Sequence, residues 1–151
     1  MREITLPMVL QFHDNGRQSV HDHSAAEAER YKWIESEKAG RDLGESAIRR
    51  WIREHWSGYL RHRWLEHLEG RAFWIELDQD DFGLLEREFV DSRLMPEIIN
   101  RLKTGQENLD IIVWAIDYKL PMDEVMEILR VLDINSRRIE CRLLNRLSQA
   151  G

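Results

Sequence analysis

One stretch of the sequence, residues 43–70, constrains the fold more than any other. Its apolar side chains recur at helical spacing, yet they fall on two faces rather than one. At about 100° per residue, the faces of the first and second halves point to nearly opposite sides. The first face carries Ile48, Trp51, Ile52, Trp56 and Tyr59, and the second carries Leu60, Trp64, Leu65 and Leu68.

The apolar face changes at Ser57 and Gly58, and a Gly/Ser pair is a recognised site of helix kinks. Asp42 and Glu45 have the spacing of a capping box, and Gly70 is suited to end the helix. We therefore expect either a bend at Ser57–Gly58 or one helix whose two halves pack against different neighbours.

Helix start signals recur along the rest of the chain. Ser24 and Glu27 have capping-box spacing, and Pro121 suits a first helical position. In residues 109–118, the β-branched run favours a strand, but Ile111 and Ala115 share a helical face, and we expect a helix. The predicted helices are 24–38, 43–70, 84–102 with a break or restart at Pro96, 109–118, 121–132, and a last one capped by Asn135 or Ser136.

Strand signals are few. Residues 4–12 and 73–77 are apolar and partly β-branched, and Pro7 would place the first of them at a sheet edge. We expect residues 1–23 to be irregular apart from this edge strand, which could pair with 73–77 in a hairpin or a two-stranded sheet. The fold class is therefore mainly α, a single domain over residues 1–151 with about five or six helices.

Composition narrows the classes of function. The chain has 151 residues, 42% of them hydrophobic, and a net charge of −6, which disfavours general binding to nucleic acid. A lone cysteine, Cys141, excludes an intrachain disulfide, and the longest unbroken apolar run, residues 111–116, is too short to cross a membrane. We expect a cytoplasmic protein without a cofactor or a membrane partner, and no motif names a reaction for an enzyme.

Tryptophan and arginine are concentrated in one region. Five of the six tryptophans lie between Trp33 and Trp74, with arginines among them. These residue types dominate the energetics of many protein interfaces, although the rings could equally fill the core. The leading hypothesis is a binding module that recognises a protein, or a second copy of itself, through Trp51, Trp56, Trp64, Arg49, Arg53 and Arg61.

Residues 126–147 resemble a helix-turn-helix unit. They combine an apolar first helix, a short turn, a polar cap and arginines at the start of a second helix. The resemblance implies DNA binding, with Ser136, Arg137 and Arg138 facing bases and Arg142 nearer the phosphate backbone. The chain departs from the motif at Leu129, where a small residue is preferred, and at Asp133, where glycine is preferred.

Histidines suggest a third class of function. His55, His62 and Glu66 fall along one side of the 43–70 helix if it is continuous, and such spacing can hold zinc or iron in an enzyme. Each histidine also has a structural explanation, because a buried imidazole commonly bonds a backbone carbonyl. We keep a metal-dependent enzyme on these three residues as an alternative to the two binding hypotheses.

Overall fold

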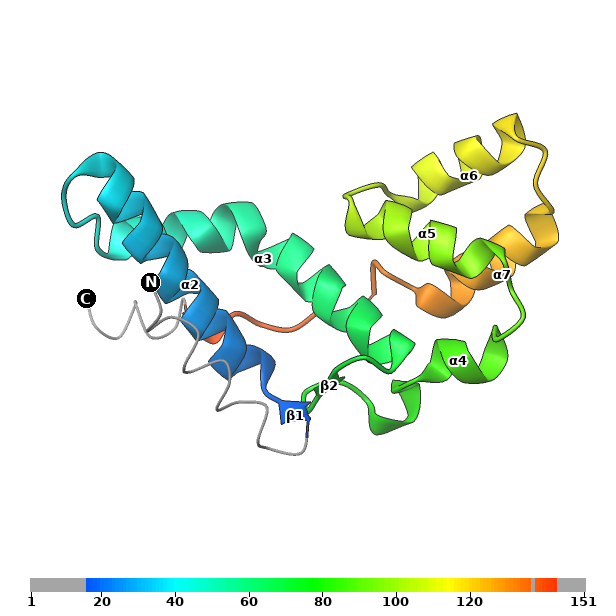
Figure 1. Ribbon diagram of the computed structural model, residues 1–151, viewed down its shortest axis with the longest axis horizontal. Coiled ribbons are helices and arrows are strands. Elements are labelled where there is room, and N and C mark those ends of the chain that lie inside the picture. Colours follow the sequence, from blue (N-terminus) through cyan, green and yellow to red (C-terminus); the bar gives the residue numbers. More distant parts are fainter. Residues whose placement is uncertain (1–15, 137, 144–151) are drawn as a thin grey trace.

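The computed structural model describes residues 16–136 and 138–143. This part of the chain confirms the predicted class, because it is mainly helical with one small sheet (Figure 1). Its elements are β1 (Arg17–Gln18), α2 (Val20–Ala39), α3 (Glu45–Glu69), β2 (Phe73–Trp74), the 3-10 turn η1 (Gln79–Asp81), α4 (Leu84–Glu88), α5 (Leu94–Lys103), α6 (Asn108–Asp117) and α7 (Met122–Leu132).

Helix α3 connects two groups of elements. Figure 1 shows α2 alongside the first half of α3, whereas α4 to α7 gather around its second half. Ile48 and Trp51 belong to a cluster with Ala28 of α2, while Leu65 and Leu68 belong to a larger cluster with buried residues of α4 to α7. The helix continues through Ser57–Gly58. Of the two expectations for this stretch, the one with different neighbours for each half is therefore confirmed.

Helix α2 begins earlier than the sequence predicted. Ser19, not Ser24, caps it, since its hydroxyl accepts the backbone N–H groups of His21 and Asp22. Glu76 strengthens this start by accepting hydrogen bonds from the Ser19 hydroxyl and the Val20 N–H. The capping carboxylate comes from a distant part of the chain, so local spacing did not reveal it. Residues 17–23 are consequently a strand and a helix start rather than irregular chain.

The strand that pairs with β2 also differs from the one expected. β2 pairs with β1 in parallel, with Arg17 opposite Phe73 and Gln18 opposite Trp74. A parallel pair needs a long crossover, and here α2 and α3 provide it, so the pair is not a hairpin. The predicted strand at 4–12 lies outside the described residues, and only the first two residues of 73–77 are in a strand.

The ambiguous segment 109–118 is helical, as expected, because it contains α6. Pro121 precedes α7, and the buried stripe of α7 consists of Val125, Ile128, Leu129 and Leu132. The two helices pack against each other and against α5, so the larger core cluster lies between α3 and the last three helices.

Candidate functional site

The indoles proposed for binding lie in different surroundings. Trp51 and Trp64 are both buried, one in each core cluster. The Trp64 indole N–H donates a 2.7 Å hydrogen bond to the carbonyl of Leu132 at the end of α7. Trp56 is half-buried and donates to the carbonyl of Ile139 at 3.3 Å. Trp51 and Trp64 therefore stabilise the fold and do not form an exposed surface.

The three arginines proposed for binding also lie in different surroundings. Arg61 holds α3 to the start of α6 through two hydrogen bonds to Glu107, at 3.0 and 2.9 Å. Arg49 and Arg53 are exposed, and within the described part of the chain their ion pairs are with acids of their own helix. A groove of about 700 Å³ between α3 and residues 134–141 brings Trp56, Arg61 and Trp64 together, whereas Trp51, Arg49 and Arg53 lie outside it.

The helix-turn-helix prediction is wrong in where its second helix begins. α7 is present, but Asp133 ends it in a left-handed conformation, Ser136 lies in a turn, and residues 138–141 are not helical. This segment instead crosses to α3, where Cys141 is buried in the smaller core cluster. Arg138 is exposed in non-helical chain, Arg142 is exposed in a helical segment that is described only as far as residue 143, and Arg137 lies outside the described residues.

The predicted metal ligands do not converge. His55 is exposed and contacts the Tyr31 ring edge to face, while His62 donates to the carbonyl of Lys103 at 3.0 Å. Glu66 accepts hydrogen bonds from Arg63 and from the indole of Trp74. Within residues 16–136 and 138–143, no group of three histidine, cysteine or acidic side chains is arranged to hold a metal.

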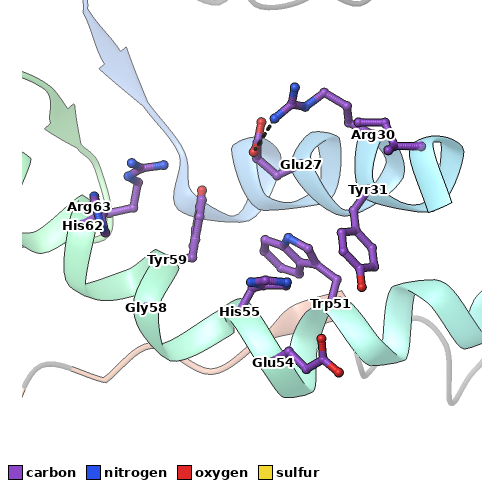
Figure 2. A pocket seen from close by; sticks show the side chains of 11 residues that line it. Glu27, Arg30, Tyr31, Trp51, Glu54, His55, Gly58, Tyr59, His62 and Arg63 are labelled. Atoms are coloured by element: carbon purple, nitrogen blue, oxygen red, sulfur yellow. Dashed lines mark ion pairs between the residues drawn. The ribbon is translucent and has the colours of Figure 1, made fainter. Parts of the chain in front are cut away.

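Figure 2 shows the cleft of about 480 Å³ between α2 and α3. Its rim carries Glu27 and Arg30 of α2, which form an ion pair at 3.7 Å, and His55 of α3. Gly58 lies on the α3 side, and a Cβ added there would meet nothing within 4 Å. The cleft therefore has the Glu27–Arg30 ion pair on its α2 side and a glycine, which has no side chain, on its α3 side.

Tyr59 lines the cleft and joins α2 to α3. Its hydroxyl lies 2.8 Å from Nδ1 of His23, and its ring stacks on His23 and Trp56. The Arg63 guanidinium lies 4.7 Å from the Tyr59 ring centroid and pairs with Glu66. Because both faces of the Tyr59 ring have neighbours, this cluster is a packed joint between helices rather than an open ring surface.

Burial sets the protonation of this joint. It raises the pKa of Tyr59 well above its ordinary value, and it lowers the pKa of His23, with a further lowering from the nearby Arg63. Both side chains are therefore neutral at pH 7, and the hydrogen bond between them joins two uncharged groups. This hydrogen bond therefore links α2 to α3 without a charge on either partner.

The surface that sequence reasoning missed lies on α6. Leu109, Val113 and Ile116 are 69%, 48% and 58% exposed, and their spacing places them in one stripe along the helix. On the opposite face, Ile111 and Ala115 are buried in the larger core cluster. α6 is thus apolar on both sides, but only one side has a neighbour within the described part of the chain.

Polar and aromatic groups lie beside this stripe. Asp110 and Asp117 are exposed and share one flank of α6 at about 100° per residue. Beyond them, Trp114 carries the guanidinium of Arg101 at 4.1 Å from its ring centroid, and Tyr118 is 71% exposed. This combination of aliphatic, aromatic and arginine side chains is the composition that the sequence led us to expect on α3.

A signal for this surface was present in the sequence. Residues 111–116 form the longest unbroken apolar run, and a helix that is apolar all round needs neighbours on every side. We used that run only to exclude a membrane span. The sequence does not show how many elements pack around α6, so the exposed side of this helix could not be predicted.

Comparisons of the chain with protein-family models, curated proteins and solved structures produced no match. In residues 16–136 and 138–143, no helix has the length and apolar character needed to cross a membrane. A function for the chain therefore has to be inferred from its own residues.

Proposed function

We propose that this protein is a binding module that recognises a partner protein through the exposed face of α6. The observation that carries the proposal is the apolar stripe of Leu109, Val113 and Ile116 on a helix whose other face is already in the core. This retains the class of function expected from the sequence and moves the surface from α3 to α6.

An exposed apolar stripe on a helix is a physical reason to expect a partner. A surface helix ordinarily places polar residues on its solvent side, and contiguous exposed apolar patches are typical of interaction sites. α6 has three large aliphatic side chains where solvent-facing polar residues would be usual. Figure 1 shows α6 at the outer edge of its helical group, on the side away from α3, so a partner can approach it.

The aromatic rim adds specificity to this surface. Tyr118 is exposed and lies 6.5 Å, ring to ring, from Trp114, which is half-buried beneath Arg101. Large rings supply contact area at a low cost in side-chain entropy. The α6 surface is defined here as Leu109, Val113, Ile116, Trp114 and Tyr118. Its aliphatic stripe is suited to the central part of an interface, and the rings, which lie beyond Asp110 and Asp117, are suited to its edge.

The decisive experiment compares two polar substitutions at exposed valines. Val113→Gln lies in the α6 surface, whereas Val90→Gln lies at another exposed site between α4 and α5. Proteins retained from the native host by the wild-type chain would be purified, and the complex would be rebuilt from pure components for titration calorimetry. We expect Val113→Gln to weaken that complex at least about tenfold and Val90→Gln to leave it unchanged.

Sedimentation of the wild-type chain alone completes the test. A self-association that Val113→Gln removes would assign the α6 surface to a second copy. Equal effects of Val113→Gln and Val90→Gln on every rebuilt complex would contradict the proposal.

A further inference from the structure

The charges beside the α6 surface indicate the kind of partner, and this step rests on the proposed function. We infer that the occupant is an amphipathic helix whose apolar stripe is flanked by basic side chains. Asp110 and Asp117 are exposed on the same flank of α6, two turns and about 10 Å apart along the helix axis. Neither carboxylate forms an ion pair within the described residues, so both can pair with cations of a partner.

The position of these carboxylates favours arginine or lysine in the partner. They lie between the aliphatic stripe on one side and the rings of Trp114 and Tyr118 on the other. A cation placed there can pair with a carboxylate while its side chain contacts an aromatic face, and Arg101 already makes such a contact on Trp114. The partner's apolar stripe would meet Val113 at the same time.

Other nearby charges do not change this assignment. Glu107, at the start of α6, is neutralised by Arg61, and Arg101 pairs with Glu97 at 3.0 Å. Lys119 follows the helix and is exposed, but it lies beyond the stripe. Asp110 and Asp117 are the acidic side chains of α6 itself, and no ion pair engages either of them among the described residues.

The same carboxylates argue against a second copy in this site. A two-fold axis that packs two α6 helices face to face and antiparallel brings equal flanks together. Asp110 and Asp117 would then meet the same residues of the other copy, and like charges across an interface are unfavourable. A partner with basic flanks removes this repulsion.

The test uses two designed helical peptides as probes. They share one leucine stripe and differ only in the flanking residues, which are lysine in one peptide and glutamate in the other. We expect the lysine peptide to bind the full chain at least about tenfold more tightly at low ionic strength, from two ion pairs and a ring contact. Added salt should narrow the difference, because exposed charges are screened.

Charge variants separate this inference from the proposed function. D110N/D117N should remove the preference for lysine, and asparagine can still accept the hydrogen bond that Asp110 takes from the Glu107 N–H. E29Q/E37Q removes two charges from α2 and should keep the preference. Val113→Gln should weaken binding of both peptides.

The outcomes are distinct. Equal binding of the two peptides, lost in Val113→Gln, would overturn the basic partner and leave the α6 surface intact as a binding site. Binding that Val113→Gln does not affect would overturn the use of α6 altogether. Self-association in the absence of peptide, weakened by Val113→Gln, would replace the basic helix with a second copy.

Discussion

Helices α3 and α6 show how poorly residue type alone predicts exposure. α3 carries tryptophans and arginines in the proportions of a binding surface, yet two groups of elements cover its two halves. α6 is a short helix with many aliphatic residues, the composition of a core helix, yet one side of it is exposed. The number of neighbouring elements, rather than the side chains themselves, decided which helix became a surface.

The comparison also separates two roles of arginine. On α3, Arg61 pairs with Glu107 and so connects the helix to the start of α6, whereas Arg63 pairs with Glu66 of its own helix and lies over the rings of Tyr59 and Trp74. On α5, Arg101 covers the ring of Trp114 beside the exposed stripe. Arginine next to tryptophan therefore marks a joint in one place and the edge of a surface in the other.

The largest effect is expected from removing a buried indole of α3. Trp64→Ala deletes a core side chain and the donor to the Leu132 carbonyl, and it should lower the free energy of unfolding by about 3–5 kcal/mol. Trp33→Ala on α2 removes an indole that is exposed and should cost less than about 1 kcal/mol. Urea unfolding followed by circular dichroism measures both.

Should Trp64→Ala fail to fold, Trp64→Phe keeps a ring in the core and removes only the N–H donor. We expect it to cost about 1–3 kcal/mol, because the Leu132 carbonyl loses its partner. If Trp64→Ala and Trp33→Ala lowered the free energy of unfolding equally, the distinction between a buried indole of α3 and an exposed indole of α2 would be wrong.

Two isoleucines of α6 test the comparison within one helix. Ile111→Ala removes a fully buried side chain and should lower the free energy of unfolding by about 2–5 kcal/mol. Ile116→Ala removes an exposed one and should change it by no more than about 0.5 kcal/mol. A large loss from Ile116→Ala in the isolated chain would mean that the stripe is covered by the chain itself.

Gly58 provides a smaller effect with a defined sign. It lies inside the continuous helix α3, and an added Cβ would meet nothing within 4 Å. Gly58→Ala should therefore raise the free energy of unfolding by about 0.5–1 kcal/mol through helix propensity. The same change at Gly44, where φ is +59°, should be destabilising, since a side chain rarely adopts that conformation. If Gly58→Ala instead lowered the free energy of unfolding, a glycine at this position in the cleft between α2 and α3 would itself be required for stability.

The smallest effect concerns pH and the joint between α2 and α3. Burial lowers the pKa of His23 below its ordinary value of 6.5, so the unfolded chain takes up a proton that the folded chain resists. The contribution of His23 to stability is then complete above pH 6.5 and is lost as the pH falls below it. His23→Phe keeps the ring contacts and should flatten this part of the pH profile, with no change of slope above pH 7. If the free energy of unfolding of His23→Phe fell below pH 6.5 as steeply as that of the wild type, His23 would not be the cause of the fall.

Much of the secondary structure was predictable because its causes are local. Pro121, Gly70 and the periodic stripe of α7 define helix ends and faces within a few residues. The start of α2 was not, because Glu76 contributes to the cap from another part of the chain. The second helix of the supposed DNA-binding motif does not begin at Asn135 or Ser136, and Cys141 instead contributes to the core cluster that contains Trp51 of α3.

The candidate site was predictable only as a class. Tryptophan and arginine led to the hypothesis of a binding module, but the residues chosen on α3 are divided between two cores and a groove. The α6 surface depends on which of the two apolar faces of the helix meets a neighbour, and the sequence of α6 alone does not show which one does. Helical spacing correctly placed His55, His62 and Glu66 on one side of α3, but it could not show their other partners. His62 bonds the carbonyl of Lys103, and Glu66 accepts from the indole of Trp74.

By itself, the sequence determined that this chain is mainly helical, where most of its helices begin and end, and that α3 has two apolar faces. Those properties follow from backbone propensities, caps and periodicity, which act over a few residues. Only the tertiary structure decided which apolar face meets a neighbour, so that α3 is covered on both faces and α6 is left open on one. Burial depends on contacts between residues far apart in the chain, and for that reason the exposed stripe of α6 was not apparent until the helices were packed.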